Sequence, residues 1–303
     1  MNGLIRLLFF GNYFYGFCAV ALSIEANLQQ HIPLNSFTYY LFVFAATVLY
    51  YTHAYIAEPA SIPEHKNKRA AWYARNRTMI AWSQLLLTIL CLSTGSYLLK
   101  ENWNNLLALK SWQWLLILIF PVVAALYYGS LSPGASKKSL RNNGWIKPFV
   151  IGLVWAGAVT VYPVVFSDLE HQRLDRPNLF MILLTLKNLM YISLLCILFD
   201  IKDYATDYNK QLQTFVVRYG LRFTLFSIII PLSLAGLGVF LVFTTLRGFR
   251  LETILINMIP FLLLITVAYS MHRRKSILYY LAIIDGLMLV KAICGIAGMI
   301  FIK

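Results

Sequence analysis

Three aspartates, Asp200, Asp203 and Asp207, lie within eight residues of one another at the end of a long apolar run. Spacings of three and four residues place their side chains on one face of a helix, where the carboxylates can converge on one object. They also lie at the C-terminal end of the predicted helix, where the macrodipole disfavours negative charge. A bound Mg²⁺ would remove this conflict, because it takes carboxylate oxygens together with substrate phosphates. The alternative is a solvated helix end whose carboxylates pair with Lys202 and Lys210.

The composition of the chain indicates that this helix belongs to a membrane protein. Of the 303 residues, 59% are hydrophobic and 13% are charged, and the mean hydropathy is +0.67. Stretches of the ~20 apolar residues that a transmembrane helix needs recur at residues 3–28, 36–57, 78–99, 112–129, 148–167, 179–200, 222–246, 254–271 and 277–302. We therefore expect an all-α integral membrane protein with about nine transmembrane helices in a single transmembrane domain, 1–303.

The basic residues predict the orientation of these helices. Lys and Arg concentrate at the N-terminus and in the loops 58–77, 130–147, 201–221 and 272–276. Because Lys and Arg are retained on the cytoplasmic side, we expect a cytoplasmic N-terminus, a C-terminus on the opposite side and a cytoplasmic acidic cluster. The formal net charge of +14 is spread over short membrane loops. This distribution favours anionic lipids or an anionic substrate as partners and excludes a nucleic-acid-binding face.

The residues that follow the acidic cluster carry a resemblance to a known family. The stretch "DIKDYATDYNKQLQTFVVRYG", residues 200–220, resembles the second aspartate-rich motif of the UbiA superfamily of intramembrane prenyltransferases. In that motif a Thr and a short apolar run ending in Gly follow the acidic segment, and Thr214, Val216, Val217 and Gly220 stand in those places. Residues 126–166 resemble the family's Tyr-containing fourth span, basic loop and Lys-led fifth span.

The resemblance implies a helical barrel around a central cavity that is open to lipid. An isoprenyl diphosphate would bind there through Mg²⁺, and its prenyl group would pass to a lipid-soluble acceptor of aromatic or quinone type. By this resemblance the three aspartates hold the metal, and Tyr128 of the fourth span lines the substrate cavity. Asn12 lies near the cytoplasmic end of the first span, on a helical face of small and polar residues. We therefore expect it either to line the cavity and reach the diphosphate or to pack against another helix. Basic side chains neutralise the departing diphosphate, and the residues that the resemblance places there are Lys68, Arg69, Arg141, Lys147, Lys202 and Lys210.

The sequence departs from the family where a first aspartate-rich motif is expected. Residues 48–77 contain no aspartate, and Thr52, His53 and Tyr55 stand in its place. Histidine is a poor ligand for Mg²⁺, so we interpret His53 as a hydrogen-bonding residue near a helix end. Arg69 can replace part of the missing metal's charge, because a guanidinium binds phosphate oxygens in bidentate fashion. An ordinary positive-inside loop explains these basic residues equally well.

Two other functions remain open. The first is a non-catalytic relative that carries an isoprenoid or lipid, or acts as a membrane scaffold after losing the first metal site. The second is an ion-coupled transporter, because ionisable residues inside spans are functional candidates by default. Its relay would use Glu25, Lys187 and Asp285, with Lys291 as a further ionisable residue inside a span. The sequence does not show how these four residues pair.

Overall fold

The computed structural model describes residues 3–56, 68–128, 143–171, 179–209, 211–271 and 279–301. Over these ranges the backbone is almost entirely helical and contains no strand. The helices divide between two compact units, Met1–Ala21 with Asn35–Ala108 and Leu22–Leu34 with Leu109–Lys303. The sequence predicts a single transmembrane domain, and the division into two compact units does not test that prediction.

Each of the nine apolar stretches forms a helix or a run of consecutive helices within the described ranges. Six of these spans are long and apolar enough to cross a bilayer, and a seventh is added if α1 and α2 form one broken span. Of the other two, α3 (Phe37–Ile56) is long enough but contains five tyrosines, and α7 (Ser111–Tyr128) is shorter. The protein is therefore a multi-pass integral membrane protein, whereas the count of nine spans stays a prediction.

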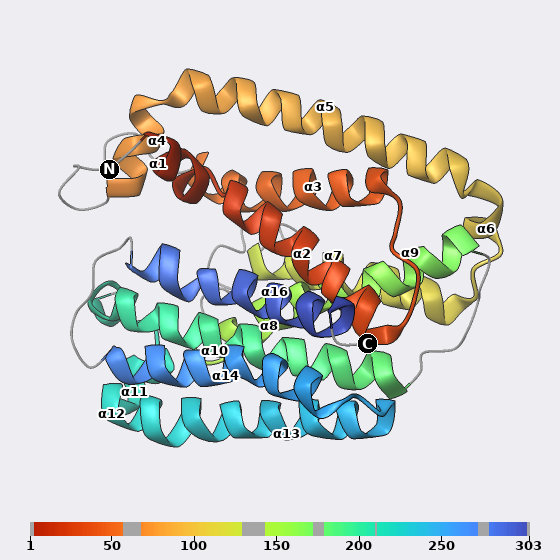
Figure 1. The fold of residues 1–303 in the computed structure, drawn as a ribbon. Coiled ribbons are helices and arrows are strands. Elements are labelled where there is room, and N and C mark those ends of the chain that lie inside the picture. Colours follow the sequence, from red (N-terminus) through yellow and green to blue (C-terminus); the bar gives the residue numbers. More distant parts are fainter. Residues whose placement is uncertain are drawn as a thin grey trace. The chain divides into compact units, whose positions relative to one another are not determined.

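The first unit is built on the contact between α3 and α5 (Arg77–Glu101), with Ala45, Val48 and Leu87 buried between them (Figure 1). It also contains α1 (Gly3–Phe10), the start of α2 (Tyr13–Gln30), α4 (Lys68–Arg75) and α6 (Trp103–Leu107). The axes of α1 and α2 meet at 61°. Asn12 lies at this break with φ of 65°, in the left-handed region that asparagine tolerates better than most residues.

The second unit is organised around α10 (Leu179–Asn209). This helix contacts α8 (Lys147–Ala156), α13 (Ile230–Arg247) and α14 (Leu251–Ser270), and α14 packs on α16 (Gly286–Ile300). Figure 1 shows α16, α10, α14 and α13 running side by side. The large side chains of Leu184, Phe240 and Phe243 fill part of this core and are fully buried. The second unit therefore holds α10 by packing along much of its length.

Three π-helical segments interrupt the spans of the second unit within the residues that the structure describes. They are η3 (Gly157–Val161) between α8 and α9 (Tyr162–His171), η4 (Thr224–Ile229) between α12 (Leu221–Phe223) and α13, and η5 (Tyr280–Ile284) before α16. Such segments change the direction of the side chains that follow them. At the first one, a Cβ on Gly157 would lie 2.2 Å from the ring of Phe120 on α7. Only glycine allows this close approach of the two helices.

Candidate functional site

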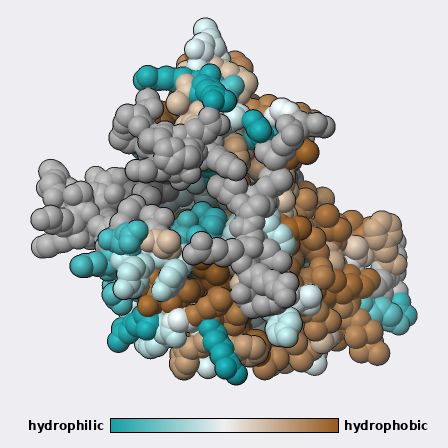
Figure 2. Space-filling view, turned by 90° about the vertical axis from the view of Figure 1, so that its left-hand side faces the viewer, coloured by the Kyte–Doolittle hydropathy of each residue, from teal (hydrophilic) through white to brown (hydrophobic). Residues whose placement is uncertain are grey.

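The acidic end of α10 brings together two of the predicted metal ligands and one predicted diphosphate-binding residue. The Lys147 ammonium on α8 lies 2.6 Å from Oδ1 of Asp200. Asp200 is 1% exposed and Asp207 is 6% exposed. Asp207 and the hydroxyl of Tyr127 also interact electrostatically with this ammonium. In Figure 2, which views the side on which α10 ends, hydrophilic residues gather beside a hydrophobic face.

Asp203 points away from this pair. Its carboxylate is 41% exposed and lies 2.7 Å from the ammonium of Lys202, its neighbour in the sequence. A helix turns by about 100° per residue, so positions seven apart lie almost in line, whereas a position three residues along lies about 60° aside. Asp200 and Asp207 therefore share the buried face, while Asp203 and Lys202 form the solvated pair that was the alternative reading of the cluster.

Local structure explains why Lys147 meets Asp200. The turn before α8 packs on the chain that follows α10, because a Cβ on Gly144 would lie 2.4 Å from the carbonyl carbon of Gln213. Thr214 then caps α11 (Phe215–Tyr219) by accepting a hydrogen bond from the backbone N–H of Val217. Gly220 separates α11 from α12 at φ of 80°, a conformation that favours glycine. The Thr and Gly of the motif thus build the turn beside the acidic end.

The carboxylate oxygens at this end suit a hard cation such as Mg²⁺ whose remaining coordination positions are filled by a ligand. Oδ2 of Asp200 is buried and has no hydrogen-bond partner among the residues that the structure describes, and an unpaired carboxylate oxygen is costly to bury. No group of three or more His, Cys, Asp or Glu side chains in the described ranges is arranged to hold a metal ion. Mg²⁺ commonly uses only one or two carboxylates together with phosphate oxygens and water. Asp200 and Asp207 are the residues that would hold it.

The region that departs from the family motif holds a closed polar network in the first unit. The guanidinium of Arg69 donates to the backbone oxygen of Phe10 at 3.0 Å, to the hydroxyl of Tyr55 at 2.9 Å and to Oδ1 of Asn12. Its carbon also lies 3.9 Å from the centre of the Tyr55 ring. Arg69 is 5% exposed. Its donors therefore satisfy the carbonyls at the end of α1, where no helical partner remains.

Further side chains complete this network. Nδ2 of Asn12 donates to Thr52 and to Tyr73, each at 3.1 Å, and the Tyr73 hydroxyl donates to the oxygen of Phe10 at 2.9 Å. Burial raises the pKa of the Tyr73 phenol, while the nearby charge of Arg69 opposes this rise. His53 is exposed. Asn12, predicted to line a substrate cavity, is thus a fully buried link between α1, α3 and α4.

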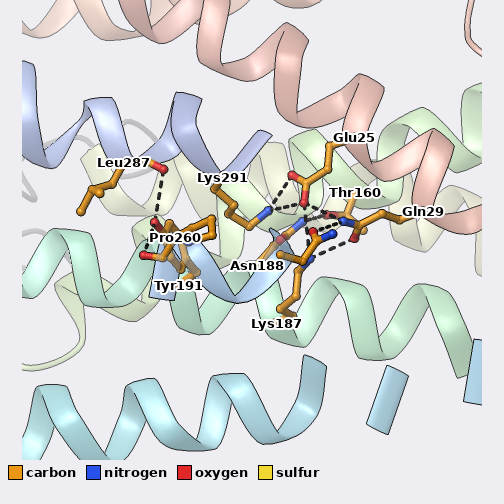
Figure 3. Close-up of polar contacts among 10 residues, drawn as sticks. Glu25, Gln29, Thr160, Lys187, Asn188, Tyr191, Pro260, Leu287 and Lys291 are labelled. Atoms are coloured by element: carbon orange, nitrogen blue, oxygen red, sulfur yellow. Dashed lines mark hydrogen bonds and ion pairs between the residues drawn. The ribbon is translucent and has the colours of Figure 1, made fainter. Parts of the chain in front are cut away.

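A second buried polar cluster lies further along α10. Glu25 on α2 accepts from Lys291 on α16 at 2.6 and 2.9 Å and from Lys187 on α10 at 3.4 Å (Figure 3). Gln29 accepts from Lys187 at 2.9 Å and donates to Asn257 on α14 at 2.8 Å. The three charged residues are at most 3% exposed. One carboxylate is thus shared by two ammonium groups inside the second unit.

Asp285, the third residue of the expected transporter relay, is also buried. It is 4% exposed and interacts electrostatically with Cys196, which interacts in the same way with Asp200. Cys196 lies nine residues, or about 13 Å, along the helix from Lys187. The relay of Glu25, Lys187 and Asp285 that a transporter would need stays a prediction.

Four of the predicted site residues lie outside what the structure describes. Arg141 and Lys210 fall outside the described ranges, and the side chains of Lys68 and Tyr128 are not described. Sequence reasoning did not single out Tyr127, the buried neighbour of Lys147, although it lies in the quoted fourth span. It also did not pair Glu25 with the two lysines. The only indication of this pairing in the sequence was that the three residues are ionisable and lie inside apolar spans.

The helical arrangement is that of a UbiA-type membrane protein. Over 99% of its length the chain is similar to a solved structure of digeranylgeranylglyceryl phosphate synthase in membranes, of which the match covers 97%. The TM-score is 0.53 and the sequence identity is 16%. That synthase is a UbiA-family prenyltransferase. No family model and no curated protein sequence matches the chain. The likeness confirms the UbiA-like fold expected from residues 126–166 and 200–220.

Proposed function

We propose that this protein is a membrane prenyltransferase that binds an isoprenyl diphosphate at the acidic end of α10. The prenyl group then passes to a lipid-soluble acceptor of aromatic or quinone type. The UbiA-like fold supports this proposal. The observation that carries it is the buried Asp200, which has one carboxylate oxygen on the Lys147 ammonium and the other without a hydrogen-bond partner in the described part of the chain. This arrangement offers both a cation-binding oxygen and a phosphate-binding ammonium.

The proposed reaction breaks the bond between the allylic carbon and the diphosphate oxygen, and the electron pair leaves with the diphosphate. A nucleophilic atom of the acceptor forms a bond to that carbon and loses its proton. Lys147 neutralises charge on the departing diphosphate, and the apolar spans exclude water from the allylic cation. Mg²⁺, when bound by Asp200 and Asp207, adds positive charge at the leaving group. The contact of Lys147 with Asp200 holds the ammonium ready before the substrate arrives.

The second candidate function is a non-catalytic carrier or scaffold for isoprenoids or lipids. The network around Arg69 favours it, because the guanidinium donors are bonded to carbonyl, amide and hydroxyl oxygens of the chain itself. A carrier needs the barrel and the apolar spans but does not need to stabilise a departing diphosphate.

A transfer assay distinguishes the two functions. Purified protein is incubated with radiolabelled isoprenyl diphosphates of several chain lengths and a total membrane-lipid extract, with Mg²⁺ or with EDTA. The transferase predicts a labelled lipid product that requires Mg²⁺ and is lost in Asp200→Asn. Saturable binding without product would support the carrier, and absence of both binding and product would refute the transferase together with a carrier of isoprenyl diphosphates.

A further inference from the structure

An apolar groove opens on the surface of the second unit at the end where α10 finishes. It is a shallow, open depression of about 410 Å³ between the start of α8, α11 and the η4–α13 span. Its walls include Phe149, Phe215, Ser227, Pro231, Leu232 and Ala235. Ser227, Pro231 and Ala235 are exposed. The groove is separate from the buried contact between Lys147 and Asp200, and the proposed transfer reaction does not use it.

The sequence explains why this surface is hollow. Ser227, Pro231 and Ala235 recur every four residues, so their short side chains lie along one face of the span. The rings of Phe149 and Phe215, whose centres are 6.2 Å apart, stand beside this strip of small residues. In a membrane-spanning helix such a strip faces either another helix or the hydrocarbon chain of a lipid.

A cationic rim adjoins the groove. The Arg218 guanidinium lies 5.3 Å from the centre of the Trp145 ring, and Trp145 packs edge-on against Phe215 in the groove wall. Arg218 lies three residues after Phe215, and both Arg218 and Arg222 are exposed. Tryptophan and arginine in this combination are typical of the membrane–water interface. The side on which α10 ends is the expected cytoplasmic side, where the leaflet carries anionic lipids.

We propose that this surface binds one anionic phospholipid, with an acyl chain in the groove and its phosphate on Arg218. The apolar groove and the cationic rim match the two parts of such a lipid. A zwitterionic phospholipid offers the same chain but no net charge to the arginine. The inference does not depend on prenyl transfer, because a carrier or a scaffold would present the same surface.

The test is native mass spectrometry of the full-length protein released from detergent with added phosphatidylglycerol or phosphatidylcholine. We expect phosphatidylglycerol to bind in preference to phosphatidylcholine. Arg218→Gln should weaken it by about fivefold, because a basic residue at an anionic membrane surface contributes that much. Ala235→Trp should fill the groove and abolish the preference. The matched controls are Arg250→Gln and Leu234→Trp, which change an exposed arginine beyond α13 and an exposed leucine that is not a groove residue.

Three outcomes would overturn the proposal. Equal binding of the two lipids, or equal losses in the groove variants and the controls, would leave no specific site. Displacement of phosphatidylglycerol by farnesyl diphosphate, with the same dependence on Ala235 and Arg218, would assign the groove to a prenyl chain instead. Thermal unfolding of each variant in the same detergent verifies that the protein is folded, as these exposed positions should allow.

Discussion

The ammonium of Lys147 lies 2.6 Å from a carboxylate oxygen of Asp200, although the two residues are 53 positions apart. Lys147 begins α8 and Asp200 lies near the end of α10, so the contact ties two packed helices together. It also places a cation beside a carboxylate whose second oxygen has no hydrogen-bond partner within the described ranges. The ion pair thus has a structural role and a proposed substrate-binding role. Stability and binding measurements on mutants can separate the two.

Replacing Lys147 by methionine should affect both roles. The buried Asp200 carboxylate would lose its counter-ion, and breaking a buried pair typically costs about 3–5 kcal/mol. Because the Lys147 side chain is 20% exposed, we expect the lower end of that range. The affinity for isoprenyl diphosphate should fall roughly 10- to 100-fold, since a charge-assisted contact is lost. Chemical unfolding and equilibrium binding measure the two effects, and unchanged affinity in folded protein would exclude Lys147 from the site.

Gly144 should be intolerant of alanine. A Cβ added at this position would lie 2.4 Å from the carbonyl carbon of Gln213, so the turn that carries Lys147 must move away from the chain after α10. We expect Gly144→Ala to destabilise the protein by about 1–3 kcal/mol and to weaken diphosphate binding. The control is Gly238→Ala on the exposed face of α13, where nothing lies within 4 Å of the added Cβ. That change should stabilise the helix by about 0.5–1 kcal/mol, and equal effects at both glycines would contradict the close contact.

The buried cluster of Glu25 should contribute strongly to stability. Glu25→Gln leaves the ammonium groups of Lys187 and Lys291 facing each other without a carboxylate, so we expect a loss of about 3–5 kcal/mol. The double variant Glu25→Gln with Lys187→Met should recover part of this loss, because one ammonium is removed. Unfolding in detergent measures all three proteins. A single variant as stable as the wild type would refute the ion pairs in Figure 3.

Arg69 distinguishes a structural role from phosphate binding. Arg69→Ala leaves Oδ1 of Asn12 without its guanidinium donor and leaves the oxygen of Phe10 with the Tyr73 hydroxyl alone, and we expect a loss of about 1–3 kcal/mol in stability. Arg69→Lys should rescue it poorly, because an ammonium lacks the planar fork. The exposed Arg77 is the control, and Arg77→Ala should change little. A selective loss of diphosphate affinity at full stability would instead support the compensation for the absent first motif.

The features that the sequence predicts well are those that depend on composition and local order. The apolar stretches predict helical spans, because a helix satisfies all backbone hydrogen bonds within one segment of a bilayer-spanning chain. The ends of α3 and α14 differ from the expected stretches by one to three residues. The resemblance over residues 126–166 and 200–220 indicated the fold, and the structural likeness confirms it at 16% identity.

The features that the sequence could not predict depend on how distant helices are rotated. Glu25 and Lys291 are 266 positions apart, and neither residue carries information about its partner. Asp203 was grouped with Asp200 because helical spacing gives a shared face, but α10 turns Asp203 toward solvent and Lys202. The break at Asn12 gives Arg69 its carbonyl partners, but this break has no sequence signature. Arg69 could therefore be interpreted from the sequence as a loop residue.

The most direct test of the proposed site is equilibrium binding of radiolabelled farnesyl diphosphate to purified protein, with Mg²⁺ and with EDTA. We expect Mg²⁺ to strengthen farnesyl diphosphate binding to the wild type. Asp200→Asn should weaken this binding by roughly tenfold or more, because the buried cation-binding oxygen is lost. Asp203→Asn, whose carboxylate is half-exposed beside Lys202, should bind nearly as well as the wild type. Affinity that is the same in Mg²⁺ and EDTA, and the same in both variants, would contradict the account.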